Sequence, residues 1–184
     1  MLKNKEEDIR RLAGEFLNGD KSAFSRLTEL IYSDILNISY RYLANMEDAK
    51  DALQASLLKI HDGLKYFKSA SKFSTWIYRI SINTSLDHLR KRRSIFDLST
   101  RFKSEAKEKT ASLKEELDLK EKKELVKKEI SKLPLRQKNA FILKHYEELT
   151  IEEISTTLGC SESAVKTHLK RAVERLRKKM EVIS

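Results

Sequence analysis

The sequence predicts an all-α protein made of two small helical domains joined by a flexible charged linker. Only 4 glycines and 1 proline occur among 184 residues, whereas sheet folds rich in tight turns need more of both. In several segments apolar side chains recur at spacings of three and four residues, as on the buried face of an amphipathic helix. With 40% hydrophobic and 36% charged residues, the composition favours small helical cores with broad solvated faces.

The charge balance indicates the chemistry of the partner. Lys and Arg number 38 against 28 Asp and Glu, which gives a formal net charge of +10. The surplus is concentrated in residues 64–93, with 8 basic and 1 acidic side chain, and in residues 163–180, with 7 basic and 1 acidic. Such a surplus favours a polyanionic partner, either nucleic acid or an anionic membrane. Two separate basic segments are typical of a protein that contacts nucleic acid at two places.

Three features predict a soluble protein of the cytoplasm. There is no run of 18 apolar residues, so we expect no membrane insertion. The first residues, MLKNKEEDIRR, lack the apolar segment of a secretory signal. The single cysteine, Cys160, has no second cysteine with which to form a disulfide within the chain.

The first domain, residues 1–93, is expected to contain helices over residues 23–44, 48–67 and 75–93. In the second of these helices an apolar stripe faces inward, and Leu58 lies outside it. An exposed leucine is often incidental, but here it is also a candidate docking point for another protein. The polar residues on the same outer face are Asp48, Asp51 and Gln54.

The third helix, from about Thr75 to Arg93, ends in the basic run Arg90, Lys91, Arg92 and Arg93. Cations suit the C-terminal end of a helix dipole, but four in succession also favour contacts with nucleic-acid phosphates. Trp76 and Asn83 are expected on the same side of the helix as Arg90. Phe73 is assigned to a polar loop over residues 68–74, where it either stacks on an unpaired base or anchors the loop in the core.

Residues 94–118 are assigned to the linker. They lack a sustained apolar stripe and mix charged residues with Ser and Thr, which is typical of a flexible segment. An ordered, solvated segment is the alternative interpretation.

The second domain, residues 119–184, begins with predicted helices over residues 120–132 and 135–146. Pro134 separates them, because proline ends one helix and suits the first turn of the next. The spacing Thr150-Ile151-Glu152-Glu153 then predicts a capping box at the start of a short helix.

A helix-turn-helix is predicted at the end of this domain. The short helix runs to Leu158, Gly159 provides the turn, and Ser161 caps a second, basic helix. This order is typical of a motif whose second helix enters the major groove of DNA, although a helical hairpin with a solvated charged face is the alternative. The side chains expected on or beside its outer face are Ser163, Lys166, Thr167, Lys170, Arg171 and Arg175.

Together these segments resemble the extracytoplasmic-function (ECF) sigma factors of bacterial RNA polymerase, over about residues 20–93 and 120–180. EDAKDALQASLLKIHDGLKYF resembles region 2.2, which docks on the clamp of the polymerase β′ subunit. FSTWIYRISINTSLDHLRKRR resembles regions 2.3 and 2.4, which melt and read the −10 element. LPLRQKNAFILKHYEELTIEEISTTLGCSESAVKTHLKRAVERLRKK resembles region 4, which reads the −35 element. The order and spacing of the three segments make the resemblance specific.

The resemblance implies a dissociable specificity subunit that binds core RNA polymerase and directs promoter-specific transcription initiation. The implied partners are core RNA polymerase, through its β′ clamp and β flap, promoter DNA and an anti-sigma factor. The implied polymerase-binding residues are Asp48, Asp51, Gln54 and Leu58. The implied −10 residues are Phe73, Trp76, Asn83, Arg90, Lys91, Arg92 and Arg93. The implied −35 residues are Ser163, Lys166, Thr167, Lys170, Arg171 and Arg175.

Two departures from the family pattern limit what the resemblance implies. Ala55 stands where the family often has Glu, which weakens one expected polymerase contact. Ser163 and Ala164 replace the usual Gly-Thr at the start of the basic helix, so base preference at that end is not carried over.

No residue pattern indicates an enzyme, a cofactor or a metal site. The four histidines are scattered, and none is at ligand spacing from another histidine or from Cys160. Two alternatives to the sigma factor remain: an autonomous helix-turn-helix regulator, and a protein whose basic faces bind an acidic protein. The autonomous regulator would usually dimerise, and no long apolar stripe is left over for a dimer helix.

Overall fold

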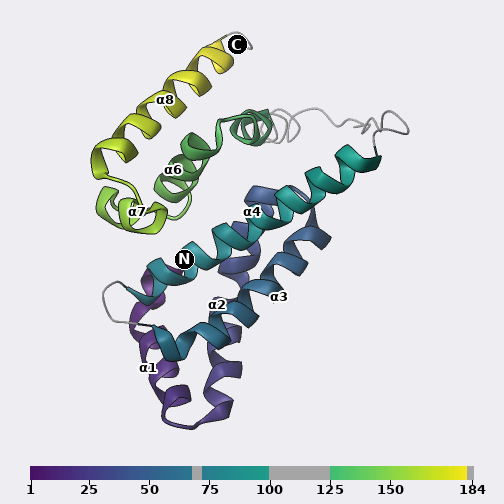
Figure 1. Ribbon diagram of the computed structural model, residues 1–184. Helices are drawn as coiled ribbons and strands as arrows, with labels where there is room; N and C mark the ends of the chain where they lie inside the picture. Colours follow the sequence, from purple (N-terminus) through teal and green to yellow (C-terminus); the bar gives the residue numbers. More distant parts are fainter. Residues whose placement is uncertain (68–71, 100–124, 182–184) are drawn as a thin grey trace, which may run out of the picture. The chain divides into compact units, whose positions relative to one another are not determined.

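A computed structural model describes residues 1–67, 72–99 and 125–181. Every regular element in these ranges is a helix (Figure 1), which confirms the all-α prediction. The helices form two compact units, of which the first contains Met1–Ile95. The predicted linker lies mostly outside the described residues, because residues 100–118 belong to the range 100–124.

The first unit is built from four α-helices and two short 3-10 helices. In chain order they are η1 (Leu2–Lys5), α1 (Glu6–Leu17), α2 (Lys21–Leu43), α3 (Met46–Gly63), η2 (Leu64–Tyr66) and α4 (Phe73–Ser99). Their core follows the predicted apolar stripes, because α2 buries Ile31 and Ile35, α3 buries Leu53 and Ile60, and α4 buries Tyr78. The amphipathic periodicity of the sequence therefore locates these helices, although α2 and α3 each begin two residues before the predicted starts at 23 and 48. Helix α3 also ends at Gly63, before the predicted end at residue 67.

Small polar residues let α4 pack closely against α2. Ser81 and Ser85 of α4 are fully buried, as is Ser39 of α2. The hydroxyl of Ser85 lies 3.3 Å from that of Ser39 and 2.8 Å from the backbone carbonyl oxygen of Ser81. Each buried hydroxyl thus has a polar partner, and burying it does not leave a donor unsatisfied.

Helix α1 was not predicted from the sequence, yet it is part of the first core. Leu2, Ile9, Leu12 and Ala13 are all buried. Its first turn carries the acidic residues Glu6, Glu7 and Asp8, but Ile9, Leu12, Ala13 and Phe16 then recur at helical spacing, so the sequence does carry an amphipathic signal here. Its apolar side chains become buried through contacts with α2 and with the two 3-10 helices.

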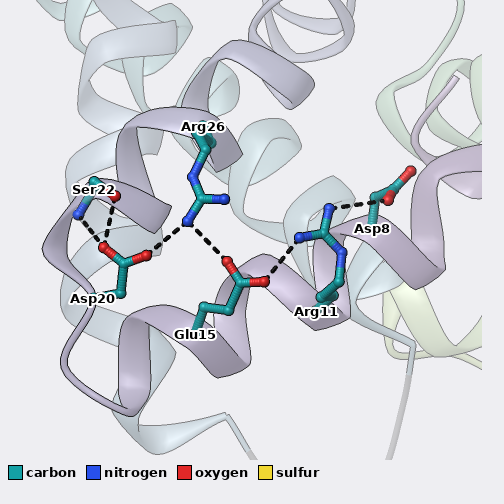
Figure 2. Close-up of polar contacts among 6 residues, drawn as sticks. All are labelled: Asp8, Arg11, Glu15, Asp20, Ser22 and Arg26. Carbon is teal, nitrogen blue, oxygen red and sulfur yellow. Dashed lines mark hydrogen bonds and ion pairs between the residues drawn. The ribbon is translucent and has the colours of Figure 1, made fainter.

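A chain of ion pairs also joins α1 to the start of α2 (Figure 2). Arg26 of α2 places Nη2 2.8 Å from Glu15 Oε2 and 2.7 Å from Asp20 Oδ2. Glu15 in turn accepts a hydrogen bond from Arg11, which raises the pKa of that guanidinium. Asp20 caps α2 by accepting from the Ser22 amide at 2.9 Å, and the Ser22 hydroxyl lowers the pKa of Asp20. The two helices are therefore fastened at their connection.

Helix α4 differs from its prediction at both ends. It begins at Phe73 rather than Thr75, and it continues to Ser99 rather than ending at Arg93. The backbone therefore stays helical over the first six residues assigned to the linker. Neither Gly nor Pro occurs between Arg93 and Ser99, so no local signal ends the helix there. The expected domain boundary after Arg93 thus lies within a helix.

The second unit contains most of the helix-turn-helix. Residues 125–131 are helical and are followed by α6 (Leu135–His145), α7 (Ile151–Leu158) and α8 (Glu162–Glu181). Pro134 occupies the N-cap position of α6 and separates it from the preceding helix as predicted. Its carbonyl oxygen accepts hydrogen bonds from the amides of Gln137 and Lys138, each at 2.9 Å. The core is made of buried apolar residues from each of these segments and their connections: Ile130, Leu133, Ala140, Ile142, Leu143, Leu149, Ile154, Val165 and Ala172.

The described residues contain neither a membrane-spanning helix nor a group of metal-ligating side chains. None of the helices there is long and apolar enough to cross a membrane. In the same part of the chain, no three His, Cys, Asp or Glu side chains are grouped so as to hold a metal ion.

Candidate polymerase-docking and DNA-binding surfaces

The α3 outer face, defined as Asp48, Asp51, Gln54 and Leu58, is open to solvent. Leu58 is 66% exposed, Asp51 and Gln54 are exposed, and Asp48 is half-buried. The opposite side of α3 is buried in the core, so the helix cannot rotate to hide Leu58 without exposing Leu53 and Ile60. The start of the face is fixed by Asn45, whose side chain accepts a hydrogen bond from the Asp48 amide at 3.0 Å.

An ion pair connects the α3 outer face to the basic run of α4. Arg92 places Nη1 2.8 Å from Asp48 Oδ2, and both side chains are partly exposed. Within α4, Arg90 pairs with Asp87 at 3.1 Å. Arg90, Lys91 and Arg92 are exposed, whereas the side chain of Arg93 lies outside the described residues. Two of the predicted DNA-binding arginines therefore have acidic partners in the free protein.

The remaining predicted −10 residues are in different environments. Asn83 is exposed on α4, and Trp76 is half-buried. Phe73, in contrast, is the first residue of α4 and only 6% exposed. Its ring stacks on Phe67 with a centroid distance of 3.9 Å. The assignment of Phe73 to a loop is therefore wrong, and its burial favours the alternative of an anchor in the core. Stacking of Phe73 on a base stays a prediction.

Trp76 completes this aromatic cluster. Its ring centroid lies 5.3 Å from that of Phe67 and 6.3 Å from that of Phe73. Gly63, the last residue of α3, makes room for it, because a Cβ atom at this position would lie 2.8 Å from Trp76 Cζ2. The cluster thus joins the end of α3 to the start of the helix that carries Asn83 and the basic run.

The helix-turn-helix has the predicted caps. The Thr150 amide donates to Glu153 Oε2 at 2.9 Å, and the Glu153 amide donates to Thr150 Oγ1 at 3.2 Å, which is a complete capping box. Gly159 adopts a φ of +63° in the turn, a left-handed conformation that favours glycine. Ser161 then accepts a hydrogen bond from the Ala164 amide at 3.2 Å at the start of α8.

The α8 outer face carries every side chain predicted to contact −35 DNA. All six residues are exposed, namely Ser163, Lys166, Thr167, Lys170, Arg171 and Arg175, while Val165 and Ala172 are buried on the inner side. The Thr167 hydroxyl donates to the Ser163 backbone carbonyl at 3.0 Å. Because that hydrogen bond engages the hydroxyl, the methyl group of Thr167 is suited to an apolar contact with a thymine methyl group.

One polar residue near these surfaces was missed by sequence reasoning. The Glu6 carboxylate of α1 accepts hydrogen bonds from the backbone amides of Phe73 at 2.8 Å and Ser74 at 2.9 Å. These residues are separated by 67 and 68 positions, so no spacing pattern predicts the contact. The indirect signal is Lys72, since a lysine precedes α4 where a capping residue is preferred.

Two known protein families match this chain, one over most of the first unit and the other over most of the second. The family described as Sigma-70 region 2 matches residues 27–95, and the family described as Sigma-70, region 4 matches residues 123–176. The sigma factor YlaC of Bacillus subtilis is 34% identical over 151 residues, covering 81% of this chain and 87% of YlaC. The ECF sigma factor SigW of the same organism is 27% identical over 181 residues, covering 94% of this chain and 96% of SigW.

Solved structures show the same fold. CnrH, in complex with the cytosolic domain of CnrY, superimposes with a TM-score of 0.70 at 19% identity and covers 95% of this chain and 98% of its own. The sigma factor RpoE of Bartonella quintana, in complex with the anti-sigma factor NepR, gives a TM-score of 0.67 at 23% identity. The match covers 86% of this chain and 97% of the RpoE chain. The chain therefore belongs to the sigma-70 family of RNA polymerase sigma factors, in its extracytoplasmic-function group. Proteins of this family act in transcription initiation as regulators rather than as enzymes.

Proposed function

We propose that this sigma factor binds core RNA polymerase and selects promoters by reading a −10 and a −35 element with its two units. The observation that carries the proposal is the match between residue type and exposure on two helices. The α3 outer face carries an exposed leucine amid polar groups, and the α8 outer face carries six exposed polar or basic side chains. A leucine surrounded by polar residues is suited to a protein partner, and a basic helix after a turn is suited to the major groove.

Core RNA polymerase is the proposed partner of the α3 outer face. Leu58 would insert into an apolar site on the β′ clamp, with Asp51 and Gln54 forming hydrogen bonds around it. Asp48 already pairs with Arg92 in the free protein. A polymerase cation that binds the Asp48 carboxylate would therefore compete with Arg92. The second unit is proposed to contact the β flap.

The −10 strand is the proposed partner of α4. Asn83 is exposed and follows Trp76 by two turns of helix, while Arg90, Lys91 and Arg92 continue along the same helix. Separating a −10 base from its stack requires roughly a few kcal/mol, which must be offset by contacts with the protein. We assign Asn83 to the extruded base and the arginines to phosphates. Trp76 lies beside them, and Phe73 supports the site through its contacts in the core.

Duplex −35 DNA is the proposed partner of α8. Lys166, Lys170 and Arg171 lie in the N-terminal half of the helix, the part that a recognition helix inserts into the groove. Their cationic groups are suited to guanine edges and to phosphates. Ser163, Thr167 and Arg175 complete the contact surface.

An anti-sigma factor is the proposed regulator. RpoE of Bartonella quintana was solved in complex with the anti-sigma factor NepR, and the present chain has the same fold. A protein of this kind would block transcription by covering a surface needed for core binding, such as the α3 outer face. We expect core RNA polymerase and the regulator to compete for the chain.

Co-elution with cognate core RNA polymerase in gel filtration tests the docking face. We expect wild-type chain to co-elute and Leu58→Asp to be lost from the complex, because a carboxylate would be buried without a partner. Leu17→Asp is the matched control, since Leu17 is also exposed on the first unit but lies on α1. If the Leu58→Asp variant still co-elutes with the polymerase, Leu58 is not part of the contact and the docking surface lies elsewhere on the chain. Failure of the folded wild type to co-elute would favour an autonomous DNA-binding regulator.

Transcription of fragmented genomic DNA by the reconstituted holoenzyme tests promoter reading. Sequencing the RNA 5′ ends locates the start sites, and alignment of the upstream DNA is expected to show two shared elements near −10 and −35. Transcripts that begin without shared upstream elements would contradict the proposal.

A further inference from the structure

We propose that Glu6 is a positioning residue for −10 recognition, because it caps helix α4 from a different helix. The inference rests on the proposed function, since α4 is the helix assigned to the −10 strand. It gives the first helix of the chain a specific task beyond burying apolar surface. Glu6 lies outside the segment matched by the Sigma-70 region 2 family, which begins at residue 27.

Glu6 caps α4 with both oxygens of its carboxylate. Glu6 Oε1 lies 2.8 Å from the Phe73 amide nitrogen, and Oε2 lies 2.9 Å from the Ser74 amide nitrogen. The first amides of a helix have no partner within the helix, and a negative charge there also complements the helix dipole. The side chain of Glu6 is only 18% exposed, so the hydrogen bonds are partly shielded from water and from salt.

Helix α4 depends on this cap because its own sequence supplies a poor one. The residue before Phe73 is Lys72, whose side chain has no acceptor and whose charge repels the positive end of the helix dipole. Ser, Thr, Asp or Asn at this position would accept from the amide of the second or third helical residue. Without Glu6 the first turn of α4 would therefore fray.

The start of α4 is also where the aromatic cluster is assembled. Phe73 stacks on Phe67, and Trp76 lies one turn further along α4 against the same ring. Fraying of the first turn would release Phe73 from Phe67 and shift Trp76, which is a predicted −10 residue. The effect of Glu6 on DNA would thus pass through backbone position and not through a direct contact.

Glu6 is itself held firmly. Arg10 Nη2 lies 3.5 Å from Glu6 Oε1, and its guanidinium also lies 5.9 Å from the centre of the Phe73 ring. Lys5, the residue before Glu6, donates hydrogen bonds at 2.7 Å to the Leu30 carbonyl and to the buried Asp34 of α2. At the other end of α1, the ion pairs drawn in Figure 2 fasten the helix to Arg26 and Asp20. The cap therefore acts from a helix anchored at both ends.

The experiment measures DNA opening by holoenzyme built from cognate core RNA polymerase and the full-length chain. Promoters are those found with wild-type holoenzyme on fragmented genomic DNA, and opening is read by permanganate reactivity of unpaired thymines. Loss of a helix cap changes an equilibrium by roughly twofold to thirtyfold. We expect Glu6→Ala to reduce the ratio of open to closed complex by a factor within about that range, with core affinity unchanged. Glu7→Ala, an exposed glutamate on the same turn, is the matched control and should behave as wild type.

A second substitution separates capping from general stability. Lys72→Ser supplies a local cap for α4, so we expect Glu6→Ala to have little effect in the Lys72→Ser background, judged against Lys72→Ser alone. A reduction of the same size in both backgrounds would overturn the capping role, as would wild-type opening by Glu6→Ala. Amide hydrogen exchange provides a direct readout, with faster exchange expected at Phe73 and Ser74 in Glu6→Ala. If wild-type holoenzyme opens no DNA, the proposed function fails, whereas a defect limited to Glu6→Ala leaves that function intact.

Discussion

Gly63 shows how one small residue controls the position of a candidate DNA-binding side chain. The position is occupied by glycine because Trp76 lies against the backbone there, and an added Cβ atom would meet the indole at 2.8 Å. Nothing in the local sequence distinguishes Gly63 from a glycine that merely ends a helix. The reason for the glycine is steric and comes from a different helix.

Gly63→Ala is expected to lower the melting temperature and to shift the fluorescence of Trp76. Overpacking of this kind costs about 1–3 kcal/mol, and Trp76 is the single tryptophan of the chain, so its emission reports this site alone. Gly14→Ala is the control, because a Cβ atom at Gly14 would have no atom within 4 Å and alanine favours helix α1. Identical emission spectra for wild type and Gly63→Ala would contradict the packing described for Trp76.

Helices in this protein are delimited by caps that differ in origin. Helices α2, α7 and α8 have local capping residues, namely Asp20, Thr150 and Ser161, and each lies close to a predicted helix start. Helix α4 takes its cap from Glu6, which is 67 positions from Phe73 in the sequence. Local caps are visible in a sequence because donor and acceptor are neighbours, whereas a cap from another helix is not.

The cap of α2 makes stability depend on pH in a defined direction. Because hydrogen bonds from Ser22 lower the pKa of Asp20, the folded state binds the Asp20 proton less tightly than the unfolded state does. The resulting stability is present at neutral pH and is lost as the pH falls through the folded-state pKa. We therefore expect Asp20→Asn, which keeps a capping oxygen but cannot ionise, to melt at a lower temperature than wild type at pH 7.

Thermal unfolding followed by circular dichroism checks this expectation. The difference in melting temperature between wild type and Asp20→Asn should shrink between pH 7 and about pH 3, below the ordinary pKa of aspartate. Glu7→Gln serves as a control for removal of an exposed acid from the same unit. A difference that stays constant over this range would show that ionisation of Asp20 does not contribute to stability.

The whole chain is proposed to bind one promoter through two units, which predicts how paired substitutions combine. Arg90→Ala on α4 and Arg171→Ala on α8 remove cations from different units. We expect each to weaken promoter binding by holoenzyme and to reduce its salt dependence, by up to about 0.7 in the log–log slope for a single-strand phosphate and about 0.9 for a duplex phosphate. In the double variant the two losses of binding free energy should add to within about 0.5 kcal/mol.

Equilibrium binding to the genomic promoters at several salt concentrations measures these quantities. Lys21→Ala is the control for loss of one positive charge, since Lys21 is exposed at the start of α2, a helix that carries none of the predicted DNA-binding residues. A double variant no weaker than one of the single variants would show that the two arginines do not contribute independently.

The sequence by itself determined the all-α class, the helix-turn-helix and the orientation of the outer faces. These features depend on interactions between residues a few positions apart: the helical period that buries Leu53 and exposes Leu58, the reciprocal bonds of Thr150 and Glu153, and the turn at Gly159. Such interactions are local, so a pattern of neighbouring residues is enough to predict them.

Only the tertiary structure decided the surroundings of the start of α4. Phe73 was expected in a loop and is buried against Phe67, and Glu6 binds backbone amides that are 67 and 68 positions away. The ion pair of Asp48 with Arg92 spans 44 positions in the same way. Contacts at such separations depend on how helices pack, which the periodicity of each helix does not specify. The helices and their outer faces were therefore predictable, whereas the contacts that position them against one another were not.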